Sequence, residues 1–529
     1  MTTHTADPSA PIQLSRGDVR VVMAGLLSLV LLAALDQTVM ATALPSIAED
    51  LGGLDQYSWA VAAYLLPGTA AMPIYGKVID ARGPTPVLAA AATLFIAGSL
   101  LCGISQTMDQ LVWSRGVQGL GAGGLMTLAF TVTFMVAPPK ARPFYQNLFG
   151  VVFAIASITG PLAGGALAAT AWRWLFLGNV PLAIAGTIAV AIVLRRLPTP
   201  RRGGPFDLAG AALLITAALL WLLVASFAGV VLPWTSPTLW TLTAAAAGAS
   251  WLLILRERTA ADPVLPLHLF RNRTFALSGL AAALLGVLLF GGVLFIPLYL
   301  QLVRGLTPTD SGLAMVPMML AMVATSILSG KLIGATGRFR ATLVTGAALT
   351  ITGLGIASTF DRTSSPALIT ASLVLLGAGM GLCMQNVLTA AQTSLPPQAI
   401  GAGTSLVSFT RQLGASLGVA ILGALLNAQW AARLADTLPP ADDTSRPDAE
   451  QLFDGLLASG SPANQLVSGA FLDAFHITML AATGTALLLA VATAALPSRL
   501  PHGEQALSTD SGRNWRTVVH HHGEVPPKP

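Results

Sequence analysis

Long apolar runs separated by short polar segments make up most of this chain. Fourteen of the runs are long enough to cross a bilayer, because about 20 apolar residues rising 1.5 Å each span a hydrocarbon core of about 30 Å. The pattern therefore predicts an all-helical polytopic membrane protein with fourteen spans. The predicted spans are 20–47, 57–78, 86–105, 110–136, 144–169, 174–194, 208–230, 237–255, 275–300, 311–333, 341–359, 366–391, 402–427 and 474–496.

Basic residues are unevenly distributed between these runs. With the N-terminus in the cytosol, 21 lysines and arginines fall on cytosolic segments and 5 on external ones. Cytosolic loops of membrane proteins carry this excess, and an even number of spans places both termini in the cytoplasm. Membrane topology explains the net charge of +5 better than nucleic-acid binding does. We therefore expect no nucleic-acid partner.

The composition agrees with a membrane protein. Of the residues, 54% are hydrophobic and 10% are charged, whereas soluble domains have about 25% charged residues. The two cysteines, Cys102 and Cys383, both lie inside apolar runs, so we expect core residues and no disulfide framework.

One carboxylate, Asp36, interrupts the first apolar run. An ionised aspartate at the centre of a bilayer costs roughly 2.5 to 3.5 kcal/mol, so it usually faces a bundle interior or a wet cavity. Counted from Arg20, Asp36 lies about 24 Å along the helix, which leaves snorkelling to the interface as an alternative. Its depth alone does not decide between the two.

Arg115 in the fourth run is the expected partner of Asp36. It lies about 10 Å below the outer face, at a depth similar to that of Asp36. A neighbouring guanidinium favours the ionised carboxylate and desolvation favours the neutral form, so a carboxylate balanced between them can exchange a proton. We expect the pair to line an aqueous chamber. A static pair that only fixes helix packing is the alternative.

Arg411 is the other formal charge at hydrocarbon depth, about 16 Å into the thirteenth run. Anion binding, a bond to a helix-end carbonyl and a structural role are its candidate functions. Apolar and amphipathic side chains suit adaptable binding of apolar ligands, although most such residues in a membrane protein face lipid or the core. With Arg411, the candidates for a substrate cavity are Met40, Tyr64, Met126, Phe153, Met315, Met318, Asn386 and Phe409.

A weak internal repeat divides the chain. The pattern G-K-x-x-x-x-x-G occurs at Gly76–Gly83 and again at Gly330–Gly337. Repeated halves with a site at their interface are typical of secondary transporters. The predicted units are a cytosolic N-terminus at 1–19, a six-helix half at 20–197, two extra helices at 198–260, a second six-helix half at 261–496 with an external loop at 428–473, and a disordered cytosolic tail at 497–529.

The predicted external loop at 428–473 is acidic. It carries seven acids against two arginines, so we expect a solvated loop with at most one short helix. A mouth that attracts cations is the functional alternative.

Three motifs resemble those of a known family. R-x-x-Q-G-x-G-A from Arg115, G-P-x-x-G-G from Gly160 and G-x-x-x-D-x-x-G from Gly76 resemble the signature motifs of the major facilitator superfamily. The second of them is the motif associated with antiporters. The stretch from Leu35 to Pro45 resembles the first span of the fourteen-span drug:H+ antiporter branch, the EmrB/QacA type.

This resemblance implies a major facilitator fold of two six-helix halves plus two inserted helices. It also implies that Asp36 couples protons to transport or binds a cationic substrate, and that Arg115 relays protons. After Asp80 the sequence departs from the family pattern, because Ala81 precedes Arg82 and a basic pair is missing at 84–85, so we expect a thinner charge network there. The implied gating and motif residues are Gly76, Asp80, Arg82, Gly83, Gln118, Gly119, Gly160, Pro161, Gly164 and Gly165.

By the same resemblance, we expect a multidrug exporter in the bacterial inner (cell) membrane. It would export hydrophobic or amphipathic, lipophilic or cationic small molecules against inward proton flow, as a monomer in the bilayer. We expect no metal, no enzymatic activity and no cofactor besides the proton gradient, because the sequence has no G-x-x-x-x-G-K-[ST] loop and no clustered nucleophiles or metal ligands. The alternatives are a dedicated exporter of one endogenous metabolite, antibiotic or lipid, a proton-driven importer, and a membrane-embedded enzyme.

Overall fold

The computed structural model describes residues 15–52, 57–196, 207–228, 232–233, 235–260, 263–264, 267–292, 295–437 and 462–498. The fold is all-helical. Its first half contains α1 (Arg16–Leu51), α2 (Tyr57–Arg82), α3 (Pro84–Ile104), α4 (Met108–Val136), η2 (Pro139–Ala141), α5 (Arg142–Ala171), α6 (Arg173–Leu177) and α7 (Asn179–Leu194).

Two helices, α8 (Leu208–Phe227) and α9 (Pro237–Thr259), connect the first half to the second. The second half contains η3 (Leu267–Arg271), α10 (Arg273–Gly286), η4 (Val287–Gly292), α11 (Phe295–Leu302), α12 (Pro308–Ala314), α13 (Val316–Thr336), α14 (Phe339–Ala357), α15 (Pro366–Thr393), η5 (Pro397–Ala399), α16 (Ile400–Thr437) and α18 (Pro462–Ala494).

Capping residues set the helix starts. The Ser15 side chain accepts a hydrogen bond from the Asp18 N–H, and the Ser15 N–H donates one to the Asp18 carboxylate, so α1 begins four residues before the predicted span. Thr107 caps α4, and Ser365 caps α15 ahead of Pro366. The predicted span 275–300 is divided, because a π-helical segment, η4, interrupts it.

The prediction for 428–473 as a loop is wrong at both of its ends. Helix α16 continues to Thr437 and α18 begins at Pro462. The physical reason is packing between the two extensions, where Trp430 meets Phe471 edge to face and Arg433 pairs with Asp473 at 3.9 Å. The middle of that segment, like 1–14 and 499–529, lies outside the described residues.

Among the described residues, eleven helices are long and apolar enough to cross a membrane. Two shorter apolar helices, Leu208–Val224 and Arg273–Leu289, also occur, and α2 falls in neither group. The chain is therefore a multi-pass membrane protein.

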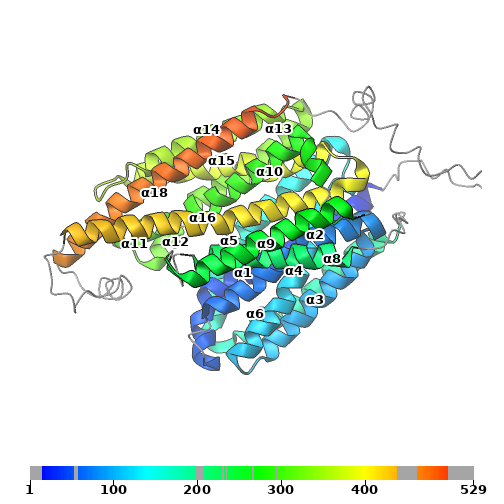
Figure 1. The fold of residues 1–529 in the computed structure, drawn as a ribbon, viewed down its shortest axis with the longest axis horizontal. Helices are drawn as coiled ribbons and strands as arrows, with labels where there is room; N and C mark the ends of the chain where they lie inside the picture. Colours follow the sequence, from blue (N-terminus) through cyan, green and yellow to red (C-terminus); the bar gives the residue numbers. More distant parts are fainter. Residues whose placement is uncertain are drawn as a thin grey trace, which may run out of the picture.

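The helices form two packed groups that meet along α16. Figure 1 shows α16 running along most of the bundle, between the blue-to-cyan helices of the first half and the green-to-orange helices of the second. The halves touch where α2 packs on α16 and where α5 packs on α13. Helices α8 and α9 pack on each other, and α8 also contacts both α2 and α16.

Both copies of the repeated pattern lie where the halves touch. A Cβ on Gly76 in α2 would collide with the Gly401 carbonyl of α16, and a Cβ on Gly330 in α13 would collide with the first turn of α5 at Phe144. Bare backbone at these positions lets each helix pair approach closely. We call this end of the bundle, where α2 and α13 end and α5 and α16 begin, the gate end.

Candidate functional site

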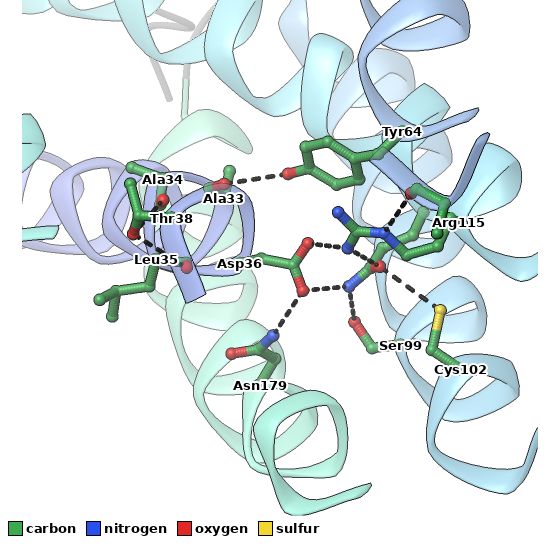
Figure 2. Close-up of polar contacts among 12 residues, drawn as sticks. Ala33, Ala34, Leu35, Asp36, Thr38, Tyr64, Ser99, Cys102, Arg115 and Asn179 are labelled. Atoms are coloured by element: carbon green, nitrogen blue, oxygen red, sulfur yellow. Dashed lines mark hydrogen bonds and ion pairs between the residues drawn. The ribbon is translucent and has the colours of Figure 1, made fainter. Parts of the chain in front are cut away.

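The Asp36 carboxylate lies inside the first half and is bound by side chains of two other helices (Figure 2). Arg115 of α4 donates to Oδ2 and forms an ion pair with it. Gln118, one turn later on α4, donates to Oδ1 at 2.8 Å, and Asn179 at the start of α7 donates to the same oxygen at 3.3 Å. The expected pairing of Asp36 with Arg115 is present.

Arg115 is held from several sides. Its Nη1 also donates to Gln118 Oε1 at 2.9 Å, and its Nε donates to the Ala60 carbonyl at 3.4 Å. The guanidinium lies over the Tyr64 ring, 4.1 Å from the centroid, which is a cation–π geometry. The Tyr64 hydroxyl donates to the Ala33 carbonyl of α1 at 3.0 Å, so α1, α2 and α4 are tied together around the pair (Figure 2).

Glycines let the helices approach closely enough to form this site. A Cβ on Gly119 would collide with the Tyr64 carbonyl, and a Cβ on Gly98 in α3 would collide with the Gln118 backbone. Gln118 therefore reaches Ser99 of α3, donating to its Oγ at 2.9 Å. Sequence reasoning had assigned Gln118 only to a motif and had not proposed Ser99.

The pair is not in an aqueous chamber in this conformation. The side chains of Asp36 and Arg115 are only 2% and 1% exposed. Packed protein therefore surrounds the pair where we expected an aqueous chamber. Three N–H donors surround the carboxylate and satisfy its oxygens with hydrogen bonds.

The antiporter-type motif on α5 packs against α1. A Cβ on Gly160 would collide with Thr38, and one on Gly164 with Thr42, whereas Gly165 has open space beside it. Thr38 also donates to the Ala156 carbonyl at 2.9 Å, which joins α1 to α5. Pro161 lies within α5.

The motif residues of α2 lie at the gate end, against the start of α16. Asp80 accepts hydrogen bonds from the backbone N–H groups of Gly401 and Ala402, both at 2.7 Å. It thereby caps the positive end of α16 from the other half. Arg82 is exposed, and Gly83 has a φ of 83°, which favours glycine where α3 begins.

A buried polar cluster between the halves was missed by sequence reasoning. Asn147 of α5 donates to Asn386 Oδ1 of α15 at 2.9 Å, and Asn386 donates to Ser329 Oγ at 2.8 Å. Nearby, Gln146 donates to Gln392 Oε1 at 3.2 Å. Asn386, predicted to line a cavity, is instead part of this contact between halves.

The other cavity candidates are spread over several environments. Met40 is buried in the apolar core of the first half, and Tyr64 packs on Arg115. Arg411 lines a small hollow among α10, α15 and α16. The remaining candidates are Met315 and Met318, which are buried, and Met126, Phe153 and Phe409, which are half-buried.

Comparisons with known proteins agree with this architecture. A family model described as Major Facilitator Superfamily matches residues 26–419. The chain is 35% identical over 423 residues to the multidrug transporter protein MdtP of Bacillus subtilis, covering 79% of this chain and 77% of MdtP. It is 31% identical to the efflux pump dotC of Dothistroma septosporum, covering 89% of this chain and 84% of dotC.

Solved structures share the fold. The proton:xylose symporter XylE superposes with a TM-score of 0.57 at 13% identity, covering 93% of this chain and 99% of XylE. The human organic anion transporter MFSD10 gives a TM-score of 0.56 at 14% identity, covering 88% of this chain and 99% of MFSD10. At these identities the likeness concerns the fold alone.

Proposed function

Because the chain belongs to the major facilitator superfamily, we propose that it is a proton-coupled exporter of lipophilic small molecules in which Asp36 carries the coupling proton. The observation that carries the proposal is the buried Asp36 carboxylate, paired with Arg115 and bonded by Gln118 and Asn179. Relatives named as a multidrug transporter and an efflux pump support export as its direction.

The proposed coupling works through the change of charge on Asp36. The ionised carboxylate holds Arg115 and Asn179, and thereby joins α1 to α4 and α7. Protonation removes the charge that holds Arg115, so these contacts weaken and the helices around the site can rearrange. In the proposed cycle, Asp36 releases its proton and the substrate binds while the cavity faces the cytosol. The halves then rock, the substrate leaves, and Asp36 is protonated again from outside.

The proposed topology is fourteen spans with both termini in the cytoplasm of a bacterial cell, and the proposed functional unit is a monomer. The gate end then faces the cytosol. The bonds from Gly401 and Ala402 to Asp80 and the contact of Asn147 with Asn386 close this end, so the structure corresponds to a conformation shut toward the cytosol.

The test is gradient-driven uptake of ethidium into everted membrane vesicles. We expect Asp36→Asn to reduce uptake to the rate seen without a proton gradient, because the amide cannot bind and release a proton at that position. Asp109→Asn, which changes an exposed acid at the start of α4, is the matched control and should keep wild-type uptake. Uptake by Asp36→Asn that still responds fully to the gradient would remove Asp36 from the coupling role.

A further inference from the structure

A small hollow in the second half combines one cation with apolar walls. It lies among α10, α15 and α16. Arg411 supplies its positive charge and Ser408 its hydroxyl. The residues that line it are Ala282, Met384, Leu388, Val407, Ser408 and Arg411.

Close backbone packing fixes the position of Arg411. A Cβ on Gly286 of α10 would collide with the Arg411 carbonyl, and a Cβ on Gly414 would collide with the Ala283 carbonyl. Helices α10 and α16 therefore touch on both sides of this turn. Arg411 is eleven positions after Ile400, which places it about 16 Å from the start of α16.

The polar groups of the hollow have no partner among the described residues. Within the described ranges, the Arg411 guanidinium makes no hydrogen bond or ion pair, whereas Arg115 makes three hydrogen bonds through Nε and Nη1. The Ser408 hydroxyl also has no partner, although the residue is only 4% exposed. A guanidinium offers five N–H donors, and leaving them unpaired in apolar surroundings is costly.

Further unpaired polar atoms occur on the same helices. Ser278 lies one turn before Ala282 on α10, and its buried hydroxyl has no partner among the described residues. Gln385 is next to Met384 on α15, and both polar atoms of its side chain are likewise unpaired. Buried polar groups in proteins are normally hydrogen-bonded, so such a concentration needs an explanation.

We propose that Arg411 and Ser408 bind the carboxylate of an amphipathic substrate. The planar guanidinium can donate two parallel bonds to a carboxylate, and the Ser408 hydroxyl can donate a third. One cation and one hydroxyl suit a single negative charge, and the hollow, with a volume of about 10 Å³, must widen when the helices rearrange before the apolar body of the ligand can enter. The proposal rests on the proposed function, because it treats the ligand as transported cargo. It adds carboxylate-bearing compounds to the substrate class.

The test is equilibrium binding to the full-length protein in phosphatidylcholine nanodiscs, with dansylglycine and its methyl ester as fluorescent probes. The two probes share an apolar body and differ in the charge of the carboxylate. We expect the wild type to bind the acid about tenfold or more tightly than the ester, as for a charge-assisted hydrogen bond. Arg411→Gln should abolish this preference and leave ester binding unchanged, and Arg411→Lys should retain part of it.

Ser408→Ala keeps the proposal testable if Arg411→Gln fails to fold, as shown by loss of ester binding. We expect Ser408→Ala to weaken binding of dansylglycine several-fold and to leave binding of its methyl ester unchanged. The proposal is overturned if the wild type binds the acid no better than the ester, or if both Ser408→Ala and Arg411→Lys keep the full wild-type preference. The assay uses no proton gradient, so its result is independent of the Asp36→Asn experiment.

Discussion

At the residue scale, the site depends on glycines, which have no side chain, as much as on charged residues. Gly119 lets the Tyr64 backbone approach α4, and this approach places the Tyr64 ring against Arg115. The ion pair is buried, and a buried pair stabilises only when its remaining hydrogen-bonding groups are satisfied. Gln118 and Asn179 supply those bonds for Asp36.

Two glycines three residues apart on α4 give a matched test of this packing. We expect Gly119→Ala to lower the thermal unfolding temperature in detergent and to impair ethidium uptake, because its Cβ would collide with the Tyr64 carbonyl. Overpacking of this kind costs about 1 to 3 kcal/mol. Gly116→Ala should be tolerated, since the nearest atom to its Cβ is 3.7 Å away, and alanine favours a helix. Equal effects of the two substitutions would contradict the packing argument.

The pairing of Asp36 with Arg115 could be predicted from sequence because two charges at the same depth in a bilayer have few other partners. The hydrogen-bonding of the uncharged residues around the pair could not be predicted. Gln118, Asn179 and Ser99 are uncharged, and polar residues of this kind are common in membrane helices. These residues meet around the pair only because of how α3, α4 and α7 pack, and this packing cannot be predicted from the sequence of any one helix.

At the element scale, the apolar runs predicted the helices well, but their ends depended on tertiary contacts. The extensions of α16 and α18 contain charged residues that end an apolar run in sequence, yet Trp430 and Phe471 hold them together as helices. Likewise, one run became α10, η4 and α11, because hydropathy does not distinguish a π-helical turn from an α-helical one.

The hairpin of α8 and α9 is joined by an ion pair at one end, and this pair predicts a pH dependence. Asp207 caps α8 and accepts hydrogen bonds from Arg256 of α9, at 2.9 Å from Nη2. These bonds, followed by that from the Gly210 N–H, hold the pKa of the Asp207 carboxyl below its usual value. A lowered pKa means that the stabilisation is present above the usual carboxyl pKa of about 3.9 and is lost as the pH falls through the lower folded value.

We therefore expect Asp207→Asn to destabilise the protein at pH 7 and to have a smaller effect as the pH falls below about 4. Asparagine still caps a helix, so the substitution tests the charge rather than the cap. Thermal unfolding of both proteins across this pH range measures the difference. Asp109→Asn, at an exposed position, provides the baseline. A difference that stays constant with pH would argue against the role of the ion pair.

At the scale of the whole molecule, the two halves meet through related but unequal contacts. Gly76 and Gly330 occupy corresponding positions against α16 and α5. Four residues later, α2 carries Asp80, which binds backbone N–H groups of α16, whereas α13 carries Gly334, which packs on the Lys140 carbonyl. The repeat was visible in sequence. The cluster of Asn147 and Asn386 was not, because these residues are 239 positions apart and belong to no motif.

Asp80 should therefore control how firmly the gate end is closed. We expect Asp80→Asn to increase the population with the halves separated at this end, because it removes the charge that faces the positive end of α16. Spin labels at the exposed positions Arg82 and Gln398 report the separation by pulsed electron resonance. The buried Cys102 and Cys383 should label poorly. An unchanged distance distribution in Asp80→Asn would count against this role, and Asp109→Asn is the control.

The halves meet along two seams, one between α2 and α16 and one between α5 and α13, and the position of α8 makes these seams unequal. Figure 1 shows α8 and α9 on the face nearest the viewer, and α8 touches both helices of the seam between α2 and α16. Among the described elements, α8 therefore covers part of that seam, whereas the elements that touch both α5 and α13, namely η2 and α15, belong to the two halves themselves. The inserted pair of helices thus makes the two sides of the molecule unlike, and a lipophilic substrate of the proposed exporter would meet a different surface on each.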